Sequence, residues 1–122
     1  MTELVRILVL LCFMFSSVTS CLAAGNYILG NEQWSLPKNV ASILQMPAIK
    51  STLSDFEKSP ASTLLILYPG GDEGTLWANE LKAWLVSLGI SSGQIELRPG
   101  SSDINTIEMR VDSPIFDMIK NK

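Results

Sequence analysis

The stretch TLLILYPGGDEGTLWANELKAWLVSLGI, residues 63–90, joins a strand pattern to a helix pattern through a glycine-rich turn. After its opening threonine, the segment Thr63–Tyr68 is a continuous apolar run. Such a run, without polar alternation, is typical of a strand covered on both faces, so it predicts a central strand of a sheet. The strand is expected to end at Pro69-Gly70-Gly71, because proline cannot donate a hydrogen bond to a sheet ladder.

A helix is predicted next, from Thr75 to Leu88. Asp72 or Thr75 is expected to cap its first turn. Gly89 followed by Ile90 is the expected left-handed stop of the helix. The apolar residues recur at three- and four-residue steps on one face, and they are Trp77, Leu81, Trp84, Leu85 and Leu88.

The chain before this stretch predicts one short strand and two short helices. Tyr27 and Ile28 are expected to begin the strand. Apolar residues at helical spacing predict the first helix over residues 40–44. A second helix is expected from Pro47 to about Glu57, because proline is favoured at the first position of a helix.

Two alternating patterns after the stretch predict strands with one buried face and one wet face. The patterns cover residues 95–98 and 107–112. An antiparallel hairpin would place Glu96 opposite Arg110 and Arg98 opposite Glu108. Each pair would then contribute roughly 0.2–1 kcal/mol, so the hairpin is the predicted pairing.

The predicted order of elements is strand, helix, strand, helix, strand, strand. This order predicts an α/β protein of the α+β two-layer class, in which one mixed sheet carries helices on one face. Residues 25–122 are enough for a single small domain. The apolar tail at residues 115–119 is expected to dock against it as a helical turn.

Residues 1–24 have the three-part pattern of a secretory signal peptide. The apolar run Ile7–Phe15 is too short for a membrane-spanning helix, which needs about 20 apolar residues. The protein is therefore expected in the periplasm, with this segment removed. Val18-Thr19-Ser20-Cys21 resembles a bacterial lipobox. Lipidation of Cys21 is the alternative, and it would tether the protein to a membrane without spanning it.

Composition excludes several kinds of chemistry. Beyond residue 24 the chain contains no Cys and no His. It therefore offers no disulfide framework, no usual zinc ligand set and no Ser-His-Asp or Cys-His nucleophile system. Acidic residues outnumber basic ones by 12 to 9, without a basic cluster, which argues against a nucleic-acid partner. We therefore expect no enzyme activity, no metal and no cofactor.

The turn Gly70–Gly74 resembles part of the Gly-Gly-Asp-Glu-Phe signature of diguanylate cyclases. The resemblance fails because those enzymes carry the motif between two strands, and because Gly74 stands in place of the phenylalanine. Asp72 and Glu73 would repel a phosphate, and two adjacent acids supply too few oxygen ligands for a calcium loop. A tight turn in which the acids favour the start of the helix is the simpler interpretation.

Residues 64–98 resemble the fold of OmpA-like C-terminal domains. The resemblance lies in the order of a strand, a Gly- and Asp-containing loop, a helix ending in Trp84-Leu85-x-x-x-Gly89-Ile90, and a strand. It implies an OmpA-like mixed sheet and peptidoglycan binding, with Asp72 in place of the loop aspartate of the family. The helix arginine of the family falls on Trp77 here, so the ligand set is matched only in part.

A second resemblance covers most of the chain after the signal segment. It is carried by Trp34, Tyr68–Gly74, the helix pattern from Trp77 to Ile90, and Ile95–Ser101. These segments resemble a family of small exported proteins encoded in integrating conjugative elements, beside genes for a type IV secretion apparatus. The resemblance implies a non-enzymatic periplasmic accessory of conjugation that binds an envelope or secretion-apparatus protein.

The candidate binding residues are Trp34, Gly70, Gly71, Asp72 and Glu73. Trp34 is expected near an exposed edge of the domain, with packing in the core as the favoured role of its ring, and the others form the turn before the long helix. Two alternatives to protein binding stay open. One is a peptidoglycan-binding module that uses Asp72, and the other is a small hydrolase that uses Asp72 with Glu80.

Overall fold

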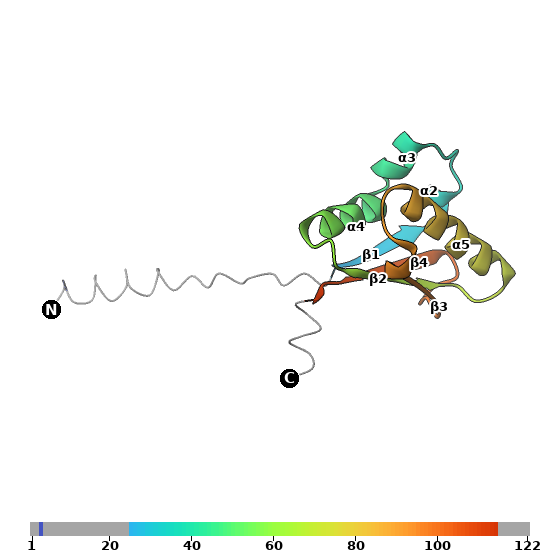
Figure 1. Ribbon diagram of the computed structural model, residues 1–122. Coiled ribbons are helices and arrows are strands. Elements are labelled where there is room, and N and C mark those ends of the chain that lie inside the picture. The colour runs from blue at the N-terminus through green and yellow to red at the C-terminus, as the bar shows by residue number, and fades with distance from the viewer. Residues whose placement is uncertain (1–2, 4–24, 115–122) are drawn as a thin grey trace.

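The protein folds into two layers, a four-stranded sheet and a set of helices that lie together on one of its faces (Figure 1). This computed structural model describes residue 3 and residues 25–114. The signal segment with Cys21 and the tail at residues 115–119 lie outside the described residues. The predicted α+β two-layer class is confirmed, as is the predicted order of strands and helices, except that a short helix over Asn31–Trp34 was not predicted.

The strands are β1 (Gly25–Gly30), β2 (Thr63–Tyr68), β3 (Ile95–Pro99) and β4 (Thr106–Asp112). They lie in the order β1-β4-β2-β3. β2 pairs in parallel with β3, whereas β4 runs antiparallel to both β1 and β2. β1, β2 and β3 therefore share one direction, and the sheet is mixed. As predicted, β2 is an internal strand.

The predicted hairpin between β3 and β4 is wrong, because β4 lies between β1 and β2 and pairs with both. This position gives β4 a ladder on each edge, whereas a hairpin at the end of the sheet would give it only one. The charged residues that suggested the hairpin pair within their own strands instead. Arg98 Nη2 lies 2.7 Å from Glu96 Oε1, and Arg110 Nη2 lies 3.3 Å from Glu108 Oε2.

Three helices connect β1 to β2, and they are α2 (Asn31–Trp34), α3 (Val40–Gln45) and α4 (Pro47–Lys58). A reciprocal cap starts α3: the Asn39 side chain accepts from the Ser42 N–H, and the Ser42 hydroxyl accepts from the Asn39 N–H. Met46 separates α3 from α4 in an extended conformation, and Pro47 is the first residue of α4. The predicted break at Pro47 and both predicted helices are confirmed.

The helix α5 (Asp72–Ser87) connects β2 to β3, and a short 3-10 turn, η1 (Ser92–Gln94), precedes β3. The predicted stop is confirmed, because Gly89 has a φ of 112° and the N–H groups of Gly89 and Ile90 donate to carbonyl groups of the last turn. The connection from β1 to β2 and the connection from β2 to β3 both join parallel strands, and both move across the sheet in the same direction. Connections of the usual right hand therefore place all their helices on one face.

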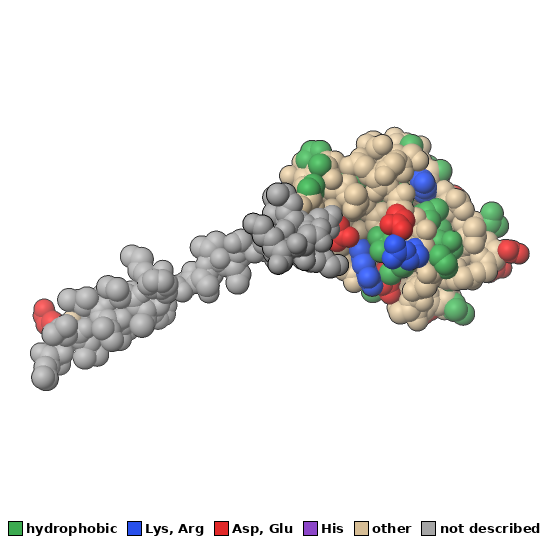
Figure 2. Space-filling model, turned by 60° about the horizontal axis from the view of Figure 1, so that its bottom comes forward, with side chains coloured by type: hydrophobic (Ala, Val, Ile, Leu, Met, Phe, Trp, Pro, Cys, Tyr) green, Lys and Arg blue, Asp and Glu red, His purple; other side chains and the backbone are tan. Residues whose placement is uncertain are grey.

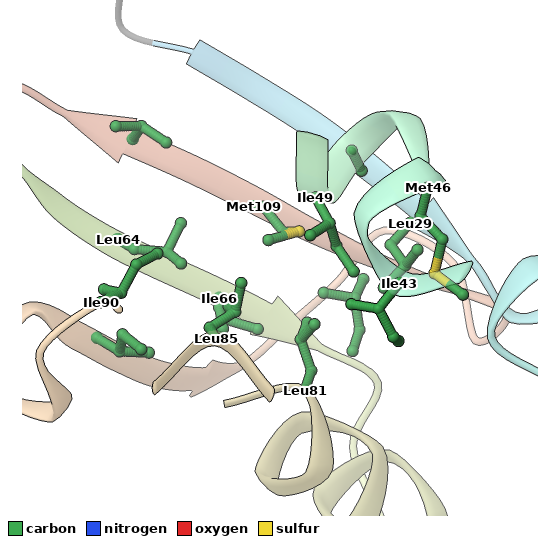
Figure 3. Close-up of a cluster of buried hydrophobic side chains, with 14 of the residues drawn as sticks. Leu29, Ile43, Met46, Ile49, Leu64, Ile66, Leu81, Leu85, Ile90 and Met109 are labelled. Carbon is green, nitrogen blue, oxygen red and sulfur yellow. The ribbon is translucent and has the colours of Figure 1, made fainter. Parts of the chain in front are cut away.

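The core lies between this helical layer and the sheet. From the predicted apolar stripe of α5, Trp77, Leu81 and Leu85 are buried. Burial of one leucine or isoleucine side chain is worth about 1.5–3 kcal/mol, so packing between the two layers stabilises the fold. Figure 3 shows apolar side chains of the sheet meeting those of the helical layer, with Leu29, Ile43, Met46, Ile49, Leu64, Ile66, Leu81, Leu85, Ile90 and Met109 labelled.

The opposite face of the sheet has no helix over it in the described part of the chain (Figure 1). Figure 2 shows apolar, basic and acidic side chains gathered on this side of the molecule. Leu65 is half-buried and Leu67 is buried, and both lie in register between charged residues of β3 and β4. Arginine stems cover apolar surface while the guanidinium stays in water. β2 is therefore covered by helices on one face and by neighbouring side chains on the other.

The turn between β2 and α5 differs from the prediction in how the helix begins. α5 starts at Asp72 and not at Thr75, and Gly71 is its N-cap residue with a φ of 96°. No side chain caps the helix, so the predicted cap by Asp72 or Thr75 is wrong. The Thr75 hydroxyl instead donates to the Gly71 carbonyl oxygen at 2.8 Å. Glycine fits position 71 because a residue with a Cβ is strained at such a φ.

Gly74, in the first turn of α5, lies against the backbone of Pro69. A Cβ atom at position 74 would overlap the Pro69 carbonyl oxygen and would lie 2.7 Å from the carbonyl carbon. This contact is between two backbone segments, so neither can move aside as a flexible side chain would. The absence of a side chain at Gly74 therefore allows α5 to leave the sheet at this angle.

We expect Gly74→Ala to lower the free energy of unfolding by about 1–3 kcal/mol, the usual cost of overpacking. Helix propensity alone predicts the opposite sign, because alanine is favoured over glycine inside a helix by about 1 kcal/mol. The control is Gly93→Ala in η1, where an added Cβ meets no atom within 4 Å. Urea unfolding measures both variants, and a Gly74→Ala protein as stable as the wild type would contradict the contact.

Candidate functional site

A groove lies at the edge of the sheet where β1 and β2 both end. Because these strands are parallel, their carboxyl ends meet at one edge, where open α/β sheets commonly bind ligands. α2 follows β1 there, the turn follows β2, and the β3–β4 loop (residues 100–105) returns to the same edge. The groove has a volume of about 410 Å³ and is lined by Asn31, Trp34, Pro69, Gly70, Glu73, Gly74, Leu76, Trp77, Glu80, Ile104 and Asn105.

The lining of the groove combines buried and exposed apolar residues. Trp34, Pro69 and Trp77 are buried. Leu76 on α5 is 71% exposed, and Ile104 in the β3–β4 loop is 82% exposed. Single exposed apolar side chains are ordinary on protein surfaces, whereas apolar residues gathered around a concavity are typical of binding sites.

The position of Trp34 is fixed by Lys38. Lys38 Nζ lies 4.7 Å from the centre of the indole ring and donates to the Trp34 carbonyl oxygen at 2.7 Å. The same ammonium group lies 3.9 Å from Glu80 Oε1, and this ion pair links the segment between α2 and α3 to α5. Of the two roles considered for Trp34, the ring is in the core and not on an exposed edge. The residue is only 5% exposed, because its ring belongs to the core cluster beneath Lys38.

Trp77, one of the lining residues, carries a polar atom without a partner in the part of the chain that the structure describes. The residue is 7% exposed, and its Nε1 is buried without a hydrogen-bond partner among the described residues. A buried donor that lacks an acceptor costs about 1–3 kcal/mol.

The structure brings together three of the five candidate binding residues. Trp34, Gly70 and Glu73 line the groove, although Trp34 is distant from the turn in sequence. Gly71 and Asp72 are exposed next to the groove and are not part of its lining. Part of the turn and Trp34 therefore lie at one groove.

The sequence did not single out four other residues of the groove lining, Asn31, Leu76, Ile104 and Asn105. Leu76 lies off the apolar stripe of α5, and Ile104 is an isolated apolar residue in a polar loop. An apolar side chain in a position that is expected to be exposed can indicate a binding surface, so both residues could have been found from the sequence. Asn31 and Asn105 gave no signal, because polar residues next to turns are common.

The alternatives built on Asp72 gain no support from the groove. Glu80 lines it and Asp72 does not, so these two carboxylates do not converge in it. The helix position of the OmpA-like arginine is the buried Trp77. Of the arginines in residues 25–114, Arg98 and Arg110 lie on the sheet face opposite the helices, away from the groove.

Hydrogen bonds at both ends fix the part of the β3–β4 loop that borders the groove. Glu108 Oε1, on β4, accepts from the Ser102 hydroxyl at 2.7 Å and from the Ser102 N–H at 3.4 Å. The Asn105 carbonyl oxygen accepts from the Asn31 N–H at 2.8 Å. Ile104 therefore lies between two anchored positions, and its exposure is not that of a loose loop tip.

No family model, no curated protein and no solved structure matches this chain. Within residues 25–114, no helix is both long and apolar enough to cross a membrane.

Glu108 gives the loop a testable pH dependence. The pKa of Glu108 lies below its ordinary value of 4.5, mainly because the Ser102 hydroxyl donates to the carboxylate. The Ser102 N–H and Arg110 lower the pKa further, whereas burial of the carboxylate raises it. Since the pKa of Glu108 is lower in the folded state than in the unfolded state, the stabilisation by its charged carboxylate is fully present above the unfolded-state pKa. It is lost as the pH falls through the folded-state pKa.

We expect Glu108→Gln to reduce the loss of unfolding free energy on acidification from about pH 6 to about pH 3. Urea unfolding at each pH measures this loss. Glu57→Gln, at an exposed carboxylate on α4, is the matched control and should keep the wild-type pH dependence. An unchanged pH dependence in Glu108→Gln would show that the Ser102 contact does not stabilise the fold.

Proposed function

We propose that this protein is an exported, non-enzymatic accessory of the bacterial envelope and that it binds another protein through the groove. The observation that carries the proposal is the exposure of Leu76 and Ile104, two large apolar side chains on separate elements that line one concave site. Burial of each against a partner is worth about 1.5–3 kcal/mol. Such a lining suits a protein segment better than a small polar ligand.

The envelope location and the kind of partner rest on the sequence. Residues 1–24 have the signal pattern, and the segments from Trp34 to Ser101 resemble small exported proteins of integrating conjugative elements. The proposed partner is therefore an envelope protein of a type IV secretion apparatus. The chain would meet the membrane only through its signal segment or through a lipid on Cys21.

Binding is favoured over catalysis by the chemistry of the groove lining. The titratable groups of the lining are Glu73 and Glu80, and both are exposed. Catalytic carboxylates are usually withdrawn from water and paired with a second functional group. The rest of the lining consists of apolar residues, glycines and two asparagines, none of which is a common nucleophile.

Site-specific photocrosslinking in the native host tests the proposal. A photoreactive residue at position 76 or 104 is expected to capture the same envelope protein. The matched control is position 86, because Val86 is an apolar residue on α5 that is 41% exposed. It lies ten residues beyond Leu76, which is about 15 Å along the helix. Position 86 should capture little of that protein.

The identity of the captured material decides between the alternatives. A secretion-apparatus protein caught at positions 76 and 104 supports the proposal. Glycan fragments alone would replace it with the peptidoglycan-binding module. Equal capture at all three positions would show that the groove is not the binding surface.

A further inference from the structure

We infer that the groove takes an extended, cationic peptide segment in which a lysine or arginine stands beside bulky apolar residues. The inference rests on the proposed function, because it takes the groove as the place where a protein partner binds. It goes further by assigning the charge and the shape of that partner.

The groove carries an excess of negative charge. Its charged lining residues, Glu73 and Glu80, are both carboxylates, and Asp72 adds a third at the start of the same helix. Glu80 lies 3.9 Å from Lys38 Nζ, whereas Asp72 and Glu73 form no ion pair within the described residues. Lys38 is already engaged by the carbonyl oxygen and the ring of Trp34.

The helix dipole does not cancel this charge. The amino end of α5 carries roughly half a positive charge, and Lys38 supplies one more. Three carboxylates therefore leave roughly one and a half negative charges around the groove. Glu80 lies in the third turn, beyond the first turn in which the dipole acts. A negative site attracts a cationic segment and repels phosphate groups, nucleic acid and anionic lipid.

The uncharged polar residues of the lining suit a peptide backbone. The side-chain amides of Asn31 and Asn105 offer both donors and acceptors, which is what an extended chain requires. The two residues are also joined by the hydrogen bond from the Asn31 N–H to the Asn105 carbonyl oxygen. They form a ridge beside the apolar residues, at which main-chain groups of a partner can bind.

The surface continues beyond this ridge. A second hollow shares Asn31 and Asn105 with the groove and is walled by Ile28, which is 61% exposed. An extended segment can therefore run from Leu76 past Ile104 to Ile28 and place an apolar side chain near each.

The test is a selection of random peptides displayed on phage against the purified protein. Selected peptides are expected to combine Lys or Arg with bulky apolar residues. Their affinity, measured by fluorescence anisotropy, is expected to fall about two- to fivefold for Glu73→Gln, the effect of one surface charge pair. Added salt should weaken binding to the wild type more than to this variant. Glu57→Gln, outside the groove, should bind like the wild type.

A second variant, Ile104→Ser, separates failure of this inference from failure of the proposed function. Peptides that need Ile104 but carry no cationic residue would overturn the inference and leave binding at the groove in place. Selection of no peptide that is sensitive to Ile104→Ser would count against both. Circular dichroism checks the fold of each variant, and both substituted side chains are exposed, so the core is unchanged.

Discussion

The position of β4 between β1 and β2 is the constraint on which the rest of the molecule depends. β4 runs antiparallel to both neighbours, so its first residue, Thr106, is paired with Gly30 at the end of β1. The β3–β4 loop must therefore enter at the edge where β1 and β2 end. The groove lies among this loop, α2 and the start of α5. It exists because the last strand is inserted into the sheet and not added at its end.

Local sequence patterns predicted the elements, but the pairing of strands depends on contacts that no local pattern contains. The apolar run Thr63–Tyr68 predicted an internal strand, and Pro47 predicted a break between helices, because neighbouring residues decide both features. The alternation around Glu96 and Arg98 indicates only which face is wet. These charges pair along their own strand as readily as across two strands. A second backbone ladder for β4 outweighs surface ion pairs worth about 0–1 kcal/mol each.

The candidate site was predicted in part for the same reason. Gly70 and Glu73 follow the central strand, whose carboxyl end is a common binding position, so the turn could be found from sequence. Trp34 could be found as an aromatic residue outside the predicted helices and strands, although it is the last residue of α2. Ile104 and Asn105 could not, because their place in the groove follows from where the β3–β4 loop returns. That return is fixed by the inserted position of β4.

The groove owes its shape to backbone contacts, whereas its exposed side chains can change without altering the fold. The packing of Gly74 against the Pro69 carbonyl sets the angle of α5, and this contact does not depend on which side chains surround it. Glu73, Leu76 and Ile104 are exposed and lie outside the core cluster. Surface substitutions of this kind usually change stability by less than about 0.5 kcal/mol. The residues proposed to choose the partner can therefore be changed with little effect on folding. For this reason, the sequence patterns that predict the sheet carry little information about the partner.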